Sequence, residues 1–394
     1  METFSTPLKR TSRLFVWMFL ALVFPSGAQT QHDANNRVER LLEELSNAPG
    51  PPGFEGPVRA ILVREMREEG LEIATDGIGS VIGVRPGPAN GPRIMLISHM
   101  DEVGGMVRSV TEEGMVKFQL LGGWLDQALV DQRWTILTSK GPVVAISGAH
   151  SVHVTSPEDR LRVTPRDDVF LDIGATSKRE AEIMGVRPGD AIVPVSAFSA
   201  IGHGRYVGKA IDDRVGCVMM IEVLRRLKER GIKTLNTVYF VGSVQEEIGL
   251  RGAHTAVSKV QPDLGISLEA GIAGDYPGGR HDLVQEVLGA GPVMYLADRR
   301  MLVNQRLHQF FEQVAQEKGI PVQTEVTLQG EEDSAEVQQF GTGRPAMNLA
   351  IPTRYLHNHN SVMQRSDLDQ AVELLVQVLT KLDARKVAEI SRFE

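Results

Sequence analysis

The sequence predicts an α/β protein that is interrupted by an all-β insert, and three observations lead to this prediction. Apolar runs such as residues 93–98 are typical of parallel strands, which are buried on both faces. Amphipathic helical patterns such as residues 302–318 alternate with these strands. Between about residues 107 and 207, short β-like runs instead alternate with Gly, Pro and Asp. We therefore expect an α/β domain into which a β domain is inserted.

A chain of 394 residues is long for one domain, and the pattern divides it into two. We expect residues 29–106 and 208–394 to form the α/β domain and residues 107–207 to form the insert. Helices are expected at residues 36–45, 55–69, 215–227, 253–260, 302–318 and 366–382. A glycine is expected to stop the helices at 55–69 and 215–227. Strands are expected at residues 71–84 (as a hairpin), 93–98, 237–241, 264–269 and 346–351.

Composition excludes several classes of protein. A net charge of −8 and a pI near 5.8 argue against a nucleic-acid binder, which needs a basic face. Cys217 is the only cysteine in the sequence, so neither an intramolecular disulfide nor a thiolate metal cluster can form. Any transition metal must therefore be held by His, Asp and Glu, which favours zinc, cobalt or manganese.

The N-terminus has the pattern of a secretory signal peptide. Three basic residues precede an apolar run over residues 14–24, and small residues follow it up to Ala28. The alternative is an uncleaved anchor, but the run is short for a membrane span. We therefore expect residues 1–28 to be a signal peptide, the mature protein to be periplasmic or secreted, and no membrane association after cleavage.

Two adjacent glutamates, Glu246 and Glu247, follow the apolar strand at residues 237–241. Neighbouring side chains on a strand point to opposite faces, so the two carboxylates can have different tasks. One can bind a metal while the other transfers protons. Taken alone, the pair could equally be a solvated strand end with two charges.

Other acidic and imidazole residues also stand where buried strands end. His99 and Asp101 follow residues 93–98, Glu269 ends another strand, and His357 follows the strand at 346–351. Asp212 lies at the entry to a helix. In open α/β sheets, ligands bind beyond the carboxyl ends of the strands. The joint occurrence of these residues indicates a metal site.

The number of candidate ligands favours two ions. Two imidazoles and three carboxylates exceed the need of one tetrahedral zinc, but they suit two ions that share a carboxylate and a water. Asp101 shares a strand face with His99, so it can accept the other imidazole N–H and fix the tautomer. Glu246 remains as the general base for the bridging water. The predicted metal ligands are His99, Asp212, Glu247, Glu269 and His357.

Each residue also has an ordinary structural interpretation. His99 alone is more often a hydrogen-bonded histidine, and Asp212 alone is more often a helix cap with a surface ion pair. Glu269 could cap the next turn, and His357 could belong to a polar loop. Cys217 is typical of a small buried residue. Three further histidines in or beside the insert are interpreted as structural: His150, His153 and His203.

The residues described above resemble the glutamyl/tetrahedral aminopeptidases, metallopeptidase family forty-two, within the clan of co-catalytic zinc exopeptidases. The resemblance extends from about Leu41 to Val376, almost all of the expected mature chain. Its motifs agree with the family in order and spacing: S-H-M-D-E-V-G (98–104), L-G-G-W (121–124), G-K-A-I-D-D-R (208–214), Q-E-E-I-G-L-R-G-A (245–253), A-G-D-Y-P-G (273–278) and I-P-T-R-Y-L-H (351–357).

The resemblance implies a role for each of these residues. One ion would be held by His99, Glu269 and the bridging Asp212. The other would be held by Glu247, His357 and the same bridge. Glu246 would be the catalytic acid/base, which agrees with the role that the residue pattern indicates.

The resemblance also implies a fold and an assembly. The fold would be a phosphorylase/hydrolase-like three-layer α/β/α catalytic domain with an inserted β-barrel-like domain used in dimerisation. Family members trim peptides from the N-terminus and often assemble as tetrahedral dodecamers. A homo-oligomer, a dimer or a larger assembly up to a dodecamer, is therefore expected.

The sequence departs from the family pattern at three places. Glu269 stands where the family usually carries Asp, and its longer side chain can still reach a metal. Asp333 falls at a family Asp position, but its neighbours in the run Glu332–Ala335 differ from the usual Gly-Thr-Asp-Ala. The polar run at residues 357–360 replaces a more usual segment of small residues and Pro.

The function expected from the sequence is a di-metal aminopeptidase that removes N-terminal residues from peptides. The first alternative is a two-metal amidase or deacylase that acts on N-acyl amino acids. The second is a metal- or peptide-binding protein without turnover. Glu246 argues against the second alternative, because binding alone needs no free base beside a metal ligand.

Overall fold

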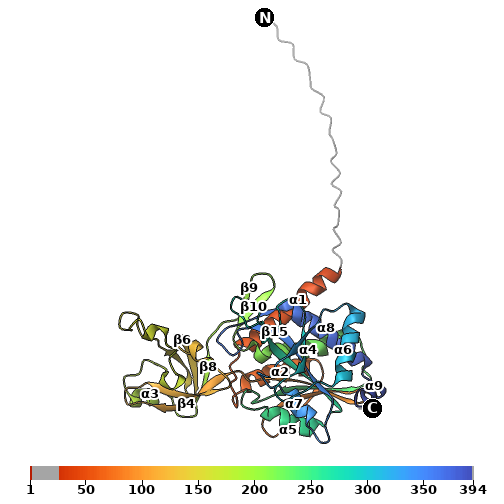
Figure 1. The fold of residues 1–394 in the computed structure, drawn as a ribbon, viewed down its shortest axis with the longest axis horizontal. Coiled ribbons are helices and arrows are strands. Elements are labelled where there is room, and N and C mark those ends of the chain that lie inside the picture. The colour runs from red at the N-terminus through yellow and green to blue at the C-terminus, as the bar shows by residue number, and fades with distance from the viewer. Residues whose placement is uncertain (2–25, 393–394) are drawn as a thin grey trace.

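The computed structural model describes Met1 and residues 26–392 (Figure 1). Within these residues, eleven strands form one mixed sheet in the order β1-β2-β11-β3-β12-β15-β16-β10-β9, with β13 and β14 attached beside β15. The strands are β1 (Glu72–Thr75), β2 (Val81–Arg85), β3 (Arg93–His99), β9 (Ser199–Ile201), β10 (Arg205–Gly208), β11 (Thr237–Ser243), β12 (Leu264–Ile272), β13 (Val293–Ala297), β14 (Gln323–Val326), β15 (Ala346–Arg354) and β16 (Ser361–Gln364).

The centre of this sheet is parallel. Strands β11, β3, β12 and β15 are parallel neighbours in that order, so their carboxyl ends meet at one edge. The side chains of Ile94 to Ile97 on β3 have no exposed surface, as expected for a strand covered on both faces. This burial explains why the sequences of the central strands are apolar throughout and do not alternate between polar and apolar residues.

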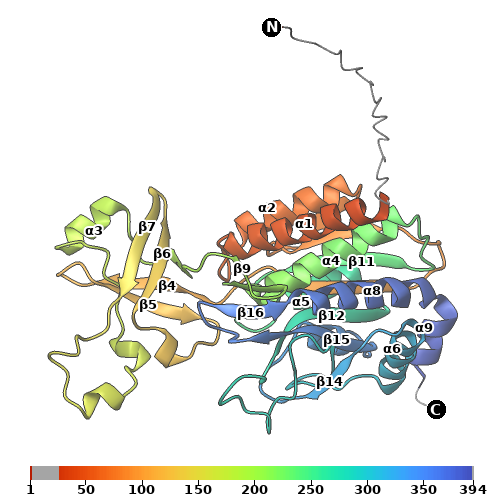
Figure 2. The ribbon, with the colours of Figure 1, turned by 90° about the horizontal axis from the view of Figure 1, so that it is seen from above.

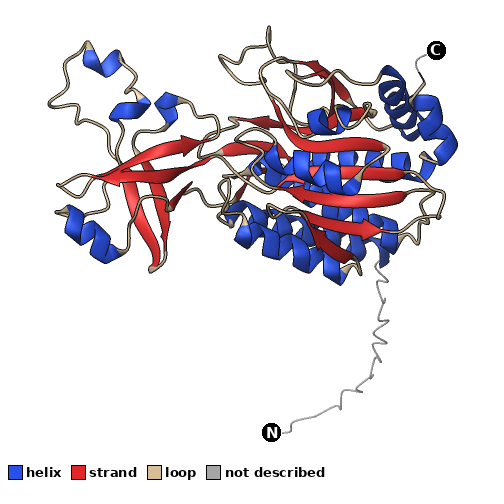
Figure 3. Ribbon diagram, turned by 90° about the horizontal axis from the view of Figure 1, so that it is seen from below, coloured by secondary structure: helices blue, strands red, loops and turns tan. Residues whose placement is uncertain are grey.

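Helices cover both faces of the sheet and form a three-layer α/β/α domain (Figures 1 and 3). On one face α4 packs against β3 and β12 and is flanked by α1, α2 and α8, while α5 and α7 lie on the other face. The helices of this domain are α1 (Ser26–Asn47), α2 (Gly56–Glu68), α4 (Ile211–Glu229), α5 (Arg251–Val260), α6 (Gln305–Lys318), α7 (Ser334–Gln338), α8 (Arg365–Lys381) and α9 (Ala384–Ile390).

The insert stands at one end of the α/β domain (Figure 2). Five strands form an antiparallel sheet in the order β5-β4-β8-β6-β7, over a separate core that contains Trp124 and Trp134. Bridges from Leu171 to β5 and from Asp172 to β7 connect the two edge strands. The elements are β4 (Gly104–Val110), β5 (Val116–Leu121), β6 (Gln132–Thr138), β7 (Gly141–Ser147), β8 (Ala191–Pro194), α3 (Lys178–Met184) and the 3-10 turns η1 (Asp126–Ala128), η2 (Asp159–Leu161) and η3 (Arg166–Asp168).

The predicted α/β fold with a β insert is confirmed. Sheet membership differs in detail from the predicted insert at residues 107–207. The small sheet already begins at Gly104, and β9 and β10 join the large sheet through the pairing of β10 with β16. Pairing with the large sheet, rather than local β character, decides where these two short strands belong.

Most of the predicted signal peptide at residues 1–28 lies outside the described residues, and Ser26 already begins α1. Among the described residues, none of the helices combines the length and the apolar character that a membrane span requires.

Candidate metal centre

The predicted site residues converge at the carboxyl edge of the parallel strands. A cavity of about 570 Å³ opens there, and five of the seven predicted residues line it: His99, Asp212, Glu246, Glu247 and His357. The other two, Asp101 and Glu269, are fully buried beside it. Residues from four strand ends and one helix start therefore meet at a single place, as the ligand rule for open α/β sheets predicts.

Asp212 lies between the two imidazoles. Its Oδ1 is 3.1 Å from Nε2 of His99, and its Oδ2 is 3.1 Å from Nε2 of His357. Burial alone would raise the pKa of Asp212, but the contacts with His357 and His99 hold it below its usual range. A carboxylate that presents one oxygen to each of two imidazoles has the arrangement of a bridging ligand.

His357 is held by the insert. Its Nδ1 lies 2.9 Å from the carbonyl oxygen of Gly123, which follows β5. A carbonyl accepts only, so Nδ1 carries the proton in this contact and Nε2 faces Asp212 and, at 3.5 Å, Glu247. His357 has a φ of +56°, in the left-handed region that non-glycine residues seldom adopt. Such strained positions cluster at functional sites.

Asp101 fixes the turn that carries the two glutamates. Its Oδ1 accepts the backbone N–H of Glu246 at 3.0 Å, and its Oδ2 accepts that of Glu247 at 3.2 Å. The same carboxylate is 3.6 Å from Nδ1 of His99, which also lies 3.1 Å from the Asp101 carbonyl. The preceding residue, Gln245, has a φ of +56°. Asp101 therefore positions both an imidazole and the glutamate turn.

The two adjacent glutamates have different surroundings. The Oε2 of Glu246 is 3.8 Å from Nε2 of His99, and burial raises the pKa of Glu246 well above its usual range. Burial also raises the pKa of Glu247 to about 7, although nearby His357 opposes this shift. The Oε1 of Glu247 is buried without a hydrogen-bond partner. Such an unpartnered carboxylate oxygen fits a metal ligand, because a buried acceptor otherwise needs a donor.

Glu269 is oriented from within β12. Ser267 donates a hydrogen bond to its Oε1, while its Oε2 is buried and unpartnered. Donor atoms of His99, Asp213 and Glu269 lie within 4.8 Å of one another, and so do those of His99, Asp212 and Glu247. These two groups share one imidazole and otherwise offer carboxylate oxygens.

This donor chemistry fits two divalent ions of the zinc, cobalt or manganese type. No sulfur ligand is available at the site. Cys217 is buried, its thiol lies 3.4 Å from the carbonyl oxygen of His99, and burial raises its pKa to about 12, so it stays protonated.

Asp213 was missed as a site residue by the sequence reasoning. It is fully buried, Ser98 donates to its Oδ2 at 2.6 Å, and the backbone N–H of Gly216 donates to its Oδ1 at 3.0 Å. The Asp212–Asp213 peptide bond is cis. The Asp-Asp pair was the available signal, but a sequence does not show which of two adjacent carboxylates faces a neighbour.

A loop between β14 and α7 adds further carboxylates. Glu331 and Glu332 line the cavity, and Asp333 is fully buried below it. Ser243 at the end of β11 donates a hydrogen bond to Asp333. The departure from the family pattern at residues 332–335 was the only indication in the sequence that this loop differs. The sequence does not show that the loop approaches the site, because this depends on tertiary contacts.

The remaining histidines lie outside the centre. His150, His153 and His203 are exposed on loops, and none of them lines the cavity of the centre. His359, two residues after His357, is buried between Trp124 and Trp134, with ring centroids 5.4 and 4.5 Å away. It anchors the loop after β15 to the core of the insert.

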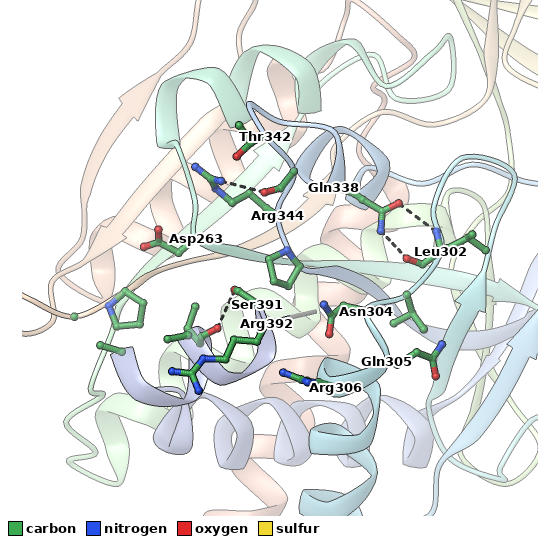
Figure 4. Close-up of a pocket in the computed structure, with 18 of the residues that line it drawn as sticks. Asp263, Leu302, Asn304, Gln305, Arg306, Gln338, Thr342, Arg344, Ser391 and Arg392 are labelled. Carbon is green, nitrogen blue, oxygen red and sulfur yellow. Dashed lines mark hydrogen bonds between the residues drawn. The ribbon is translucent and has the colours of Figure 1, made fainter. Parts of the chain in front are cut away.

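A second cavity, of about 1040 Å³, lies at the opposite edge of the sheet (Figure 4). Its lining includes Pro92, Asp263 and Pro345, which directly precede β3, β12 and β15. Arg306, Arg344 and Arg392 also line it. This cavity is larger, but it contains neither an imidazole nor a group of carboxylates, so the chemistry belongs to the smaller one.

Comparison with known proteins agrees with this placement. The sequence model of the family described as M42 glutamyl aminopeptidase matches residues 79–374. The chain is 37% identical over 354 residues to the putative aminopeptidase FrvX of Escherichia coli (strain K12), and the match covers 90% of this chain and 98% of that relative.

Solved structures show the same fold. A TET aminopeptidase from a marine sediment Thaumarchaeota archaeon superposes with a TM-score of 0.88 at 39% identity, over 91% of this chain and 100% of the other. The TET1 peptidase of Pyrococcus horikoshii, which can assemble into a tetrahedron or a large octahedral shell, gives a TM-score of 0.79 at 29% identity, over 88% and 100% of the two chains.

These comparisons correct one prediction. The match to the E. coli relative already covers 98% of that protein, which leaves no room in it for a counterpart of residues 1–28. The predicted signal peptide and periplasmic location rested on a short apolar run, and a relative of this similarity lacks such a leader. We therefore infer neither a signal peptide nor a periplasmic location for this chain.

The family match spans most of the sequence, and all seven predicted site residues fall within the matched residues 79–374. The chain belongs to the M42 glutamyl aminopeptidase family and is a metallo-aminopeptidase.

Proposed function

We propose that the enzyme uses two divalent ions, with zinc as the first candidate and cobalt or manganese as alternatives, to remove N-terminal residues from peptides. The observation that carries this proposal is the position of Asp212, whose two oxygens each lie 3.1 Å from a different imidazole. One ion would lie with His99 and Glu269, and the other with Glu247 and His357, with Asp212 shared. When bound, such ions polarise a scissile carbonyl and lower the pKa of water.

The chain's own residues would do the remaining chemistry. Glu246 borders the cavity beside His99 and would take a proton from the attacking water and return it to the leaving amine. Asp101 would keep Glu246 in reach through the backbone hydrogen bond at 3.0 Å. The buried position of Asp213 beside His99 and Glu269 makes it a further candidate for the first ion.

Membership of an aminopeptidase family does not favour the two alternatives, an amidase or deacylase for N-acyl amino acids and a binding protein without turnover. A substrate comparison separates all three. An aminopeptidase cleaves aminoacyl anilides that have a free α-amine, a deacylase cleaves only N-blocked substrates, and a binding protein cleaves neither.

We also propose that the protein is a homo-oligomer of at least a dimer. The similar Pyrococcus horikoshii peptidase forms large closed assemblies, which supports this proposal. The insert exposes apolar side chains, among them Val144 at 63% and Leu161 at 88%, and exposed apolar patches often mark contact surfaces. Sedimentation analysis of the purified chain would show the size of the assembly.

The decisive experiment is the variant Glu246→Gln. Removal of the base should lower turnover by about 10²- to 10⁴-fold, while metal content stays at two ions per chain. The matched control is Glu113→Gln, at an exposed glutamate on the β4–β5 turn, which should retain full activity. Turnover close to wild type in Glu246→Gln would refute the role of Glu246. Fewer than two tightly bound ions in the wild type would refute the di-metal site.

A further inference from the structure

Two carboxylates in the cavity have no task in the proposed mechanism. Glu331 and Glu332 precede α7 and line the same cavity as His99 and Glu246. Within residues 26–392, neither glutamate forms an ion pair or a hydrogen bond with another side chain. A carboxylate in a partly closed cavity is stabilised by a cation, and among the described residues no lysine or arginine pairs with Glu331 or Glu332.

The rest of the lining contains no lysine or arginine either. Its imidazoles, those of His99 and His357, face Asp212 and belong to the proposed metal centre. A substrate with an acidic N-terminal residue would therefore bring its carboxylate next to Glu331 and Glu332 with no basic partner. Like charges brought this close are unfavourable, so the cavity disfavours acidic residues.

Part of the cavity lining is apolar and aromatic. Ala270 and Ile272 of β12 belong to it, as do Tyr276 and Tyr355, whose ring centroids lie 5.0 Å apart. A wall of this kind covers an aliphatic stem and attracts a cation to the faces of the rings. Carboxylates and tyrosines in one cavity are complementary to a long side chain that ends in a positive charge.

Electrostatic interactions connect Glu332 to the metal centre. Glu332 interacts with Asp212 and His99, and both glutamates interact with Asp298. Glu332 is thus close enough to the centre to pair with the α-ammonium group of a substrate. Glu331 precedes Glu332 in the chain and lines the same cavity, where a substrate side chain can reach it.

We propose that the cavity selects peptides whose N-terminal residue is lysine or arginine, with Glu332 pairing with the α-ammonium group and Glu331 with the side-chain cation. The inference rests on the proposed aminopeptidase function and adds its substrate class. The aliphatic part of the substrate side chain packs on Ile272 and the tyrosine pair.

The test compares lysyl, arginyl, norleucyl and glutamyl anilides on the metal-loaded full chain. Norleucine has the aliphatic stem of lysine without its terminal ammonium group, so the lysyl-to-norleucyl ratio of kcat/KM reports the contribution of that group. We expect that ratio to be about tenfold or more in the wild type and to fall toward one in Glu331→Gln, mainly through KM. Glu113→Gln, the same substitution at an exposed site on the insert, should keep the wild-type ratio.

A charge reversal adds a gain of function. Glu331→Lys should raise the glutamyl-to-lysyl ratio by about tenfold or more, because the new ammonium group can pair with an acidic side chain. Metal content of each variant, measured in parallel, should stay at the wild-type value, which separates a selectivity effect from loss of the site.

The outcomes keep the two proposals apart. Equal kcat/KM for lysyl and norleucyl substrates, a preference for glutamyl substrates, or an unchanged ratio in both Glu331 variants would overturn the inference and leave the aminopeptidase function intact. Failure of the metal-loaded wild type to cleave any substrate with a free α-amine would overturn the proposed function itself.

Discussion

The carboxylate of Asp101 holds the backbone of Glu246, whose N–H donates to Oδ1 at 3.0 Å. The two residues follow β3 and β11, which are parallel neighbours, so the bond joins two strand ends across the sheet edge. The same carboxylate accepts the N–H of Glu247 at 3.2 Å. One buried side chain thus sets the position of both the proposed base and a proposed ligand.

Asp101→Asn should separate positioning from chemistry. An asparagine keeps the shape but turns an NH₂ group toward one of the two backbone N–H donors, so one hydrogen bond is lost. We expect metal affinity and kcat each to fall by about 10- to 100-fold while the protein stays folded. Metal titration with a competing chelator and steady-state kinetics would measure both. Unchanged metal affinity would show that Asp101 does not position the ligands.

Gly122 allows the insert to approach the metal centre. It has a φ of +85°, and a Cβ at this position would lie 2.7 Å from Cγ1 of Val103 and 2.9 Å from Oε2 of Glu247. Gly122→Ala should therefore displace the Glu247 carboxylate and lower kcat/KM by about tenfold or more. Steady-state kinetics, with metal content as a second readout, checks this expectation.

Gly141→Ala is the matched control for that variant. Gly141 has a φ of +116° on the β6–β7 turn of the same insert, and a Cβ there would meet no atom within 4 Å. Both variants carry a backbone penalty of about 1 kcal/mol, but only Gly122→Ala disturbs the centre. Equal activity of the two variants would contradict the proposed role of the close approach.

The predicted site residues lie close together in the structure because the fold rule behind the prediction is simple. The proposed ligands His99 and Glu247 lie at or just after the ends of apolar strands, and parallel strands end at one edge. The apolar runs themselves identified the central strands, because burial on both faces removes the alternation that weaker strands show. The α/β fold could therefore be predicted from these runs, whereas the family was predicted from the resemblance of the motifs between residues 98 and 357.

Features that depend on tertiary contacts could not be predicted from the sequence. The loop with Glu331 and Glu332 reaches the cavity partly because Ser243 of β11 binds Asp333. The choice between Asp212 and Asp213 depends on backbone geometry at the start of α4 that no residue pattern encodes. The signal-peptide prediction was wrong for a related reason, because a short apolar run does not by itself distinguish a signal peptide from other kinds of segment.

Lys209 belongs to a buried ion cluster behind the centre. Its Nζ lies 2.7 Å from Oε1 of Glu102, and Arg214 lies 3.6 Å from the same oxygen. Lys209→Met would leave the buried Glu102 carboxylate with the Gly50 N–H and one distant cation, so the free energy of unfolding should fall by about 3–5 kcal/mol. The double variant Lys209→Met/Glu102→Leu should recover part of this loss, because it removes the unpaired charge. Urea denaturation of the metal-free proteins at one protein concentration would measure both changes.

Glu286 gives the protein a predicted pH dependence of stability. Its carboxyl is buried, with Tyr295 donating to Oε1 at 2.8 Å, and burial raises its pKa to about 8 from an ordinary value of 4.5. The unfolded chain loses this proton at a lower pH than the folded chain. Between pH 4.5 and 8 the folded state therefore binds more protons, and the contribution of Glu286 to stability falls as pH rises.

Glu286→Gln should remove that dependence, because the amide keeps a polar side chain of the same size and cannot ionise. We expect the variant to melt at nearly the wild-type temperature at pH 5 and above it at pH 8.5, with an upper limit of about 5 kcal/mol in stability. Thermal melts across this pH range check the expectation, with Glu43→Gln, at an exposed glutamate on α1, as the control. A stability difference between Glu286→Gln and the wild type that does not grow with pH would show that Glu286 does not hold its proton in the folded protein.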